Sequence, residues 1–223
     1  MTESHIAEKT GSRETETAIL EAARNLLAEG GLDALSMRAV ASQVGLSATA
    51  IYHWFEGKED LVDRVVLHGF RRSEAYMWKA IEELPAGSMD RVAALGEAYI
   101  RFALENREYF KIIFAIQTPA PRHIEDVPGQ GGYRVLRQCV VEAIEAGNIR
   151  RTDPDVVVLF LWSLVHGLVT IFMACDPKDL LVETGCCADV GDKELTIGLF
   201  ELFHDMVREG LELEGVRGGG CDA

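Results

Sequence analysis

Residues 36–61 read "SMRAVASQVGLSATAIYHWFEGKEDL" and show the pattern of two short helices that meet at a glycine. Ser36 and Ser47 each precede a helical pattern as an N-cap, and Gly45 ends the first helix. Apolar positions recur at helical spacing, with Met37, Val40, Ala41 and Val44 in the first helix and Ile51 and Phe55 in the second. Small and hydrogen-bonding side chains are left on the exposed face of the second helix. The pattern and the lengths predict a helix-turn-helix.

The same stretch is free of acidic residues, since none occurs between Asp33 and Glu56. The whole chain has 36 Asp and Glu against 22 Lys and Arg, which gives a formal net charge of −14. Such a charge counts against a nucleic-acid partner in general, because phosphate contacts depend on Lys and Arg. Its uneven placement indicates that one surface is kept free of negative charge.

The rest of the chain also reads as helices, since apolar residues recur every three or four positions and no sustained alternation indicates a strand. An amphipathic helix precedes Ser36 and stops at Gly30 and Gly31. Further helices are predicted from near residue 58 into the eighties, over 88–105, over 107–116 and over about 131–146. With 223 residues, of which 48% are hydrophobic, the chain is expected to form one or two domains of the all-α class.

Residues 156–175 form a nearly apolar run that is long enough to span a membrane. Ser163, His166 and Thr170 interrupt the run, and no basic cluster orients it in a bilayer. Asp153 supplies an N-cap of the kind found in soluble helices. We therefore favour a helix that is buried inside a protein, and we expect no membrane partner.

A single subunit of this size covers one face of such a helix, so the other face needs a partner chain. The last helical pattern, over residues 192–213, carries a second apolar stripe and a glycine that permits close approach. Two such helices from each of two subunits make a four-helix interface, which predicts a symmetric homodimer. The interface residues that we predict are Leu164, Leu168, Leu195, Gly198, Leu199, Leu202 and Met206.

Residues 36–61 closely resemble the DNA-binding region of TetR-type (tetracycline-repressor-like) transcriptional regulators. In that pattern Ser or Thr opens the second helix, Arg follows two residues on, and A-x-x-x-G-[VL]-[ST] leads to [LI]-Y-x-[HY]-F-x-x-K. Trp54 stands where His or Tyr is usual. Independently, "GNIRRTDPDVVVLFLWSLVHGLVTI", residues 147–171, is similar to the C-terminal domain of the subgroup that is marked by a W-x-x-x-H-G motif. The motif residues here are Trp162, His166 and Gly167.

The resemblance implies an all-helical dimer with an N-terminal three-helix DNA-binding head and a C-terminal body for ligand binding and dimerisation. The expected boundaries are residues 1–60 for the head, with 1–12 disordered, residues 61–214 for the body, and residues 215–223 for a disordered tail.

The resemblance also implies base-edge contacts by Arg38, Ala48, Thr49 and Tyr52 and phosphate contacts by His53 and Lys58. Chemistry agrees in part, because Arg can donate two hydrogen bonds to guanine and methyl groups suit the thymine methyl. Two serines at helix N-termini expose backbone amides that favour a phosphate oxygen. The DNA-binding residues that we predict are Ser36, Arg38, Ser47, Ala48, Thr49, Tyr52, His53 and Lys58.

Trp162 and His166 lie one helical turn apart on the apolar run, next to Gly167. One interpretation is a pocket in which an indole wall and an imidazole meet a small apolar effector. The alternative is a core pair whose nitrogens are satisfied internally, and aromatic residues at helical spacing are also typical of plain core. The effector-binding residues that we predict are Phe102, Tyr109, Phe110, Phe114, Trp162, His166, Phe172 and Met173.

The sequence offers little support for catalysis or cofactor binding. Ser163 and His166 share a turn without a G-x-S-x-G signature, and Glu201 with His204 gives one E-x-x-H where a di-iron bundle needs two. We expect no enzyme activity, no cofactor and no metal.

The five cysteines form an odd set without C-x-x-C spacing, so we expect reduced thiols and leave open a redox role for Cys186 and Cys187. The start "MTESHIAEKT" shows no export signal, which predicts a cytoplasmic protein.

Two functions fit these observations. The first is a ligand-responsive transcriptional regulator of the repressor type that binds a palindromic operator as a homodimer and is released by a small apolar effector. The second is a helical ligand-binding or interaction protein without operator binding, which only the acidic composition supports.

Overall fold

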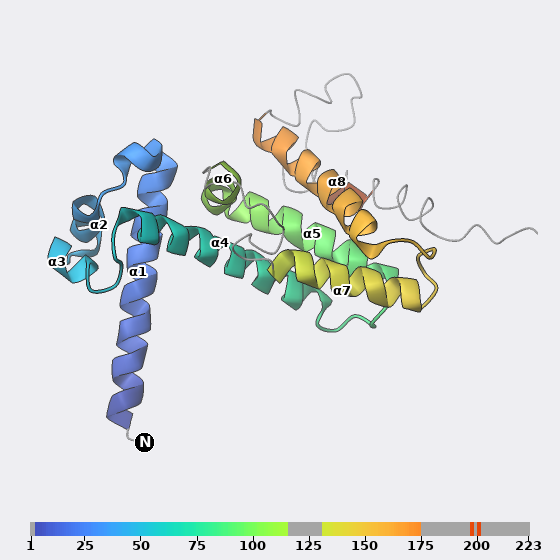
Figure 1. The fold of residues 1–223 in the computed structure, drawn as a ribbon, viewed down its shortest axis with the longest axis horizontal. Coiled ribbons are helices and arrows are strands. Elements are labelled where there is room, and N and C mark those ends of the chain that lie inside the picture. Colours follow the sequence, from blue (N-terminus) through green and yellow to red (C-terminus); the bar gives the residue numbers. More distant parts are fainter. Residues whose placement is uncertain (1–2, 116–130, 175–196, 199, 202–223) are drawn as a thin grey trace, which may run out of the picture. The chain divides into compact units, whose positions relative to one another are not determined.

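The computed structural model describes residues 3–115, 131–174, 197–198 and 200–201. Every regular element in these ranges is a helix (Figure 1), which confirms the predicted all-α fold class. The helices are α1 (Glu3–Ala34), α2 (Met37–Val44), α3 (Ala48–Ile51), α4 (Lys58–Ile81), α5 (Met89–Glu105), α6 (Arg107–Ala115), α7 (Gly131–Glu145) and α8 (Pro154–Ala174).

The chain divides into two compact units. The first comprises Met1–Arg72 and Asn106–Gln130, and the second comprises Ser73–Glu105 and Gly131–Ala223. Helix α4 therefore contributes to both units, and α6 belongs to the first. The head boundary that we predicted at residue 60 lies inside the first unit, so the packing unit is larger than the predicted DNA-binding domain.

Helix α1 packs through the predicted stripe, in which Ile19, Ala23 and Leu27 are buried. The helix breaks at Gly30 and Gly31, whose backbone angles are not helical. Gly31 has φ of 63°, a left-handed conformation that favours glycine. The start of α1 at Glu3 differs from the predicted disorder of residues 1–12 and follows from local propensity, since Glu, Ala and Lys favour helices.

The two short helices α2 and α3 form as the sequence predicts. Their inward residues Met37, Val40, Ala41, Ile51 and Phe55 are buried. Gly45 ends α2 in the left-handed conformation with φ of 69°, and its backbone N–H donates to the Ala41 carbonyl. This glycine turn redirects the chain into α3 within two residues, which gives the helix-turn-helix its geometry.

The second unit packs α5, α7, α8 and the end of α4 around one apolar core. The core residues are Met77, Ile81, Val92, Leu95, Ala98, Val135, Cys139, Val140, Ala143, Ile149, Val157 and Val158. Asp153 begins α8 as expected, since its carboxylate accepts a hydrogen bond from the Asp155 N–H at 2.9 Å. Pro154 occupies the first helical position, where no intrahelical N–H is needed.

Several predictions from the sequence concern residues outside the described ranges and stay predictions. They are the disordered tail 215–223, the interface residues Leu195, Leu199, Leu202 and Met206, and Cys175, Cys186, Cys187 and Cys221.

Gly69 lies where α4 packs tightly on α6 in the first unit. A Cβ atom there would lie 2.8 Å from Ile113 Cδ1 and 2.9 Å from Tyr109 Cδ1, and Tyr109 is fully buried. We expect Gly69→Ala to lower the free energy of unfolding by about 1–3 kcal/mol, because overpacking forces buried neighbours to shift. Urea unfolding measures the change. Gly57→Ala, where nothing lies within 4 Å of the added carbon, is the matched control, and an equal effect of both substitutions contradicts the assigned contact.

Candidate functional site

The predicted DNA-binding side chains lie on the solvent-facing side of α2, α3 and the start of α4. Ser36, Arg38, Ser47, Thr49, Tyr52, His53 and Lys58 are exposed, and Ala48 is half-buried. Tyr52 is 56% exposed although it is a large aromatic residue. An exposed aromatic ring in a stretch of sequence without acidic residues is available to a partner, so these side chains share a surface that α2, α3 and the start of α4 present. We call the exposed members of this set the α2–α3 surface.

Both short helices are held by capping serines. Ser36 Oγ accepts from the Ala39 N–H, and Ser47 Oγ accepts from the Ala50 N–H, each at 3.1 Å. Such caps are worth roughly 1 kcal/mol each, and they fix where each helix begins. The cap of α3 matters most for the surface, because α3 has only four residues and a slip of one residue would turn Thr49 and its neighbours away.

Lys58 has a structural partner that the sequence did not predict. Its ammonium group donates to the carbonyl of Leu32, just beyond the break in α1. A cation at this end satisfies a carbonyl that has no helical partner. The predicted phosphate contact of Lys58 therefore competes with an internal contact and stays a prediction.

Side chains of α4 contact Phe55 and Glu56, which follow α3, and also contact α1. The Asp60 carboxylate accepts from the Glu56 N–H at 2.9 Å. The Arg64 guanidinium lies 5.9 Å from the centre of the Phe55 ring and pairs with Glu16 of α1 at 3.3 Å. These contacts orient α3 without taking part in its exposed surface. Sequence reasoning missed the Arg64–Glu16 pair because its two residues lie 48 positions apart in the chain.

In the second unit, Trp162 and His166 of α8 meet Tyr99 of α5. The Tyr99 hydroxyl lies 2.8 Å from His166 Nδ1, and the centres of the Trp162 and His166 rings are 6.3 Å apart. The Trp162 indole N–H hydrogen-bonds to the Tyr99 side chain. Since an indole nitrogen only donates, the Tyr99 oxygen accepts this bond and its own proton is left to donate to His166 Nδ1.

This arrangement determines the protonation states of the trio. Burial lowers the pKa of His166 and raises the pKa of Tyr99, so the imidazole is neutral and the phenol keeps its proton near pH 7. Neutral His166 then carries its proton on Nε2. The contacts favour the interpretation of Trp162 and His166 as an internally bonded core pair. Tyr99, which completes the trio, carried no signal in the sequence pattern.

The other predicted effector-binding residues do not gather in one unit. Phe102 and Phe172 are buried and Met173 is half-buried in the second unit, whereas Tyr109, Phe110 and Phe114 belong to the first. The Phe110 and Phe114 rings pack on each other with centres 4.8 Å apart. The effector-binding role of all eight residues stays a prediction.

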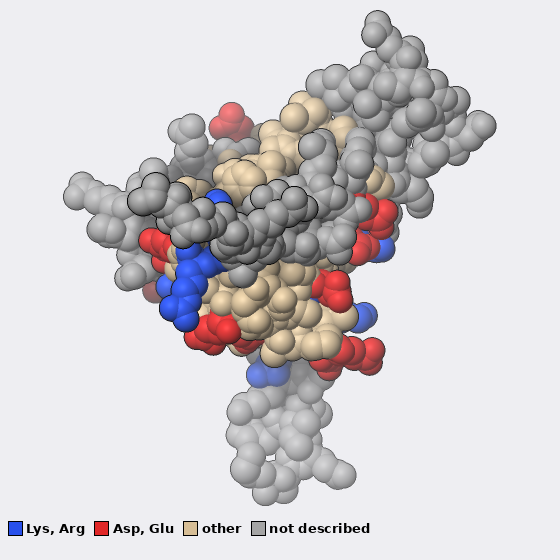
Figure 2. Space-filling view, turned by 90° about the vertical axis from the view of Figure 1, so that its right-hand side faces the viewer, with Lys and Arg blue, Asp and Glu red and all other residues tan. Residues whose placement is uncertain are grey.

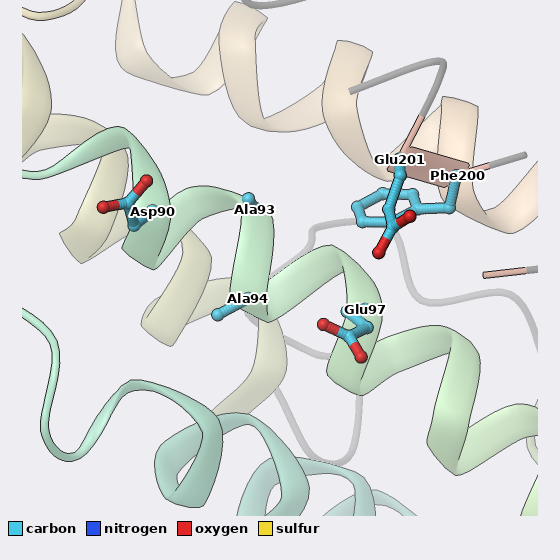
Figure 3. Close-up of a pocket in the computed structure, with 6 residues that line it drawn as sticks. All are labelled: Asp90, Ala93, Ala94, Glu97, Phe200 and Glu201. Carbon is cyan, nitrogen blue, oxygen red and sulfur yellow. The ribbon is translucent and has the colours of Figure 1, made fainter. Parts of the chain in front are cut away.

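A surface cavity of about 230 Å³ lies between α5 and residues 200–201 (Figure 3). Gly96 allows the Phe200 ring to lie against α5, since a Cβ there would come within 2.4 Å of the ring. The lining residues are Asp90, Ala93, Ala94, Glu97, Phe200 and Glu201. None of them was predicted from the sequence, and three carboxylates do not suit an apolar effector.

Helix α8 leaves one apolar face open. Val156 and Leu159 are each 61% exposed, and Phe160, Leu164 and Ile171 are also exposed. The helix is apolar and long enough to cross a membrane by length and composition. Exposed apolar area such as that of α8 marks an interaction site. Figure 2 shows one face of the molecule, on which uncharged residues, polar and apolar alike, lie between charged ones.

Two residues of the predicted interface can be placed. Leu164 lies on the open face of α8, 39% exposed, and Gly198 is exposed. Leu168 is 9% exposed and packs inside its own unit, and its predicted place in the subunit interface stays a prediction. The sequence pattern did not distinguish the two sides, because α8 is apolar on both.

The described ranges contain no group of three or more His, Cys, Asp or Glu residues that could hold a metal ion. Cys139, which lies among these residues, is a buried free thiol, and burial raises its pKa.

Comparison with known proteins agrees with this arrangement. Residues 19–65 match the family described as bacterial regulatory proteins, tetR family, and residues 92–176 match the tetracyclin repressor-like C-terminal domain. The chain is 34% identical over 74 residues to the HTH-type transcriptional regulator UidR of Escherichia coli K12, which covers 33% of this chain and 38% of UidR.

It is 31% identical over 116 residues to the HTH-type transcriptional repressor KstR2 of Rhodococcus jostii, covering 52% of this chain and 53% of KstR2. The chain thus spans about four tenths to half of the length of these curated relatives. FadR of Bacillus subtilis, solved in complex with stearoyl-CoA, has the same fold with a TM-score of 0.66 at 16% identity, covering 88% of this chain and 99% of that one. None of these matches identifies the subgroup with the W-x-x-x-H-G motif, so that part of the resemblance stays a prediction.

Both matching domains belong to regulatory proteins, in agreement with the prediction that the chain is not an enzyme. The N-terminal match includes α2 and α3 with the α2–α3 surface, and the C-terminal match includes most of α5 and all of α6, α7 and α8. The chain therefore belongs to the tetR family of bacterial regulatory proteins.

Proposed function

We propose that this protein is a transcriptional repressor that reads a palindromic operator as a homodimer in the cytoplasm and is released by a small apolar effector. The observation that carries the proposal is the α2–α3 surface: seven exposed side chains on two serine-capped helices and the residues that follow them, six of which lie in a stretch without acidic residues. A helix of this kind enters the major groove of DNA and presents its side chains to the base edges.

The residue types suggest how the groove is read. Arg38 is suited to donate two hydrogen bonds to a guanine, and Thr49 and Ala48 offer methyl groups to thymine. Tyr52 brings both a hydroxyl group and an apolar ring. The two capped helix N-termini place backbone amides where they favour phosphate oxygens. Among Arg38, Ala48, Thr49 and Tyr52, which are proposed to contact bases, Arg38 is the one cation. We therefore expect a guanine in each half-site, with shape and contacts to thymine methyl groups specifying the base pairs around it.

The open face of α8 supports the homodimer. A second copy that packs the same face against it removes Val156, Leu159 and Phe160 from water, and a two-fold axis makes the contact self-complementary. We favour a second copy over a lipid bilayer because Ser163 and His166 interrupt the apolar helix and because His166 bonds to Tyr99 within the unit. Recovery of the chain from a cell membrane fraction, rather than from the fraction that stays in solution without detergent, would contradict this choice.

We expect the affinity for the operator to depend only weakly on salt. Arg38, His53 and Lys58 are the basic side chains of the α2–α3 surface, and each phosphate contact adds about 0.9 to the slope of log affinity against log salt. A dimer therefore gives a slope no steeper than about −5. Titrations between low and moderate salt measure the slope, and a value near −10 would show that cations outside this surface carry the binding.

The effector is proposed to be small and apolar because the second unit is built around an apolar core, beside which Tyr99, Trp162 and His166 form a polar trio. Binding inside this unit shifts the population towards a dimer whose recognition helices no longer match successive major grooves. FadR binds stearoyl-CoA, and an acyl-CoA is accordingly the first probe to add to the operator complex.

Selection from a pool of randomised duplexes tests the function. Purified protein without added ligand is expected to enrich a palindrome, with half-sites about one helical turn apart. Enrichment of an asymmetric site would contradict the dimer, and no enrichment at either low or moderate salt would favour a helical ligand-binding protein without operator binding.

A further inference from the structure

The chain crosses between its two compact units next to a pair of residues that bond to each other. It leaves the first unit after Arg72 on α4 and re-enters it at Asn106, directly before α6. Arg72 Nη2 donates to Asn106 Oδ1 at 3.1 Å. Asn106 is 6% exposed, and its carbonyl accepts the first backbone hydrogen bond of α6, from Phe110 at 3.0 Å. The contact therefore ties α4 to the start of α6.

Arg72 also reaches α1. Its Nη1 lies 3.4 Å from Glu21 Oε1, and its guanidinium lies 5.5 Å from the centre of the Tyr109 ring. Arg24 of α1 lies 5.3 Å from the centre of the same ring. A planar guanidinium can stack on the ring while its fixed N–H groups donate to two acceptors, whereas a lysine ammonium has no plane that stacks. We call Arg72, Glu21, Asn106 and Tyr109 the Arg72 clasp.

The Tyr109 hydroxyl completes the connection between α6 and α1. It lies 3.0 Å from Glu21 Oε1 and 3.2 Å from His68 Nδ1. A carboxylate only accepts, so Tyr109 donates to Glu21 and receives a hydrogen bond from His68 Nδ1–H. Burial raises the pKa of Tyr109, so the phenol keeps the proton that this chain of bonds needs. Helix α6 is thus bonded to α1 and α4 through polar groups that are partly removed from water.

We propose that Arg72 is a positioning residue for regulation. Because Arg72 bonds both to Asn106 at the start of α6 and to Glu21 of α1, it makes α6 move with α1 and hence with the recognition helices. Helix α1 packs on α2, and α2 packs on α3, so a displacement of α6 reaches the α2–α3 surface through packed helices. Helix α6 is joined directly to α5 of the second unit at Glu105 and Asn106. This inference rests on the proposed operator binding.

The coupling can be tested without knowing the effector. Coupling between two sites is reciprocal. If the position of α6 changes the free energy of operator binding, operator binding must change the free energy that separates the positions of α6 by the same amount. Hydrogen exchange of backbone amides reports that freedom segment by segment. We would measure exchange in the full chain with and without the palindromic duplex obtained by selection, and compare residues 107–115 with residues 36–55.

The operator is expected to slow exchange at residues 36–55 and also at 107–115, the latter by roughly 5- to 150-fold, the usual range of allosteric coupling. In Arg72→Met, the operator should still slow exchange at 36–55, whereas its effect on 107–115 should be several-fold smaller than in the wild type, because of the polar contacts between α6 and α1 only those of Tyr109 remain. Asn106→Asp keeps an acceptor for Arg72 and should retain the response of α6.

Arg137→Met is the matched control. Arg137 also pairs with a carboxylate, donating from Nε to Asp155 Oδ1 at 2.7 Å, but it lies in the second unit. It should leave the response unchanged. The proposed role of Arg72 is wrong if the operator slows exchange at 36–55 but not at 107–115 in the wild type. It is also wrong if Arg72→Met leaves the response of 107–115 unchanged. No protection at 36–55 refutes the proposed function, and the clasp with it.

Discussion

Replacing Arg38 and Tyr52 together by alanine is expected to lower operator affinity by roughly a hundredfold to a thousandfold. A bidentate arginine–guanine contact is worth about 1–3 kcal/mol, and loss of the exposed tyrosine removes further contact area in the groove. Both side chains are exposed and take no part in the core of the first unit. The free energy of unfolding should therefore stay within about 0.5 kcal/mol of the wild-type value. Fluorescence anisotropy with the selected duplex measures the affinity.

Arg150→Ala is the control for the loss of one positive charge, because Arg150 is exposed in the second unit. It is expected to change operator affinity by less than about twofold. If the double variant binds the operator as tightly as the wild type, the α2–α3 surface is not the part of the protein that reads DNA.

Replacing Leu159 by glutamate is expected to break the dimer. Leu159 is 61% exposed in the single chain and lies on the open face of α8. Pairing two such faces would bury two unpaired carboxylates, and each costs several kcal/mol. The dissociation constant of the dimer should therefore rise by at least about a hundredfold, which sedimentation at micromolar concentration detects as monomer.

Operator affinity should fall with the dimer, because a monomer contacts only one half-site. Thr152→Glu adds the same charge at an exposed position just before α8 and should leave the dimer intact. If the Leu159→Glu protein stays dimeric, the subunit interface lies elsewhere. If the wild-type chain is monomeric, the proposed homodimer is wrong.

The sequence predicted local features of the fold well. Ser36, Gly45 and Ser47 define α2 and α3 through bonds to residues at most four positions away, so the pattern contains the information that places them. The fold class and the span of most helices follow from the same short-range periodicity. The α2–α3 surface could be predicted because it is what remains exposed once the inward positions of two short helices are assigned.

Contacts between distant parts of the chain could not be predicted in this way. Tyr99 bonds to His166 across 67 positions, and Lys58 bonds to Leu32 across 26. Such partners depend on how helices pack, which periodicity alone does not specify. Tyr109 illustrates the consequence: an aromatic residue at helical spacing suggested an effector pocket, whereas its hydroxyl bonds to Glu21 in the first unit.

The two sides of α8 show another limit. The helix is apolar all round, so the sequence predicted both Leu164 and Leu168 at the interface, although only Leu164 is exposed. Burial by α5 and α7, rather than composition, decides which side stays open.

The most direct test of the account is the affinity of the wild-type protein for two versions of the selected palindrome, one unchanged and one with five base pairs inserted between its half-sites. Half a helical turn places the half-sites on opposite sides of the duplex, where a two-fold symmetric dimer cannot engage both. We predict that affinity falls to that of a single half-site. Equal affinity for the two duplexes would contradict a dimer that reads DNA through paired recognition helices.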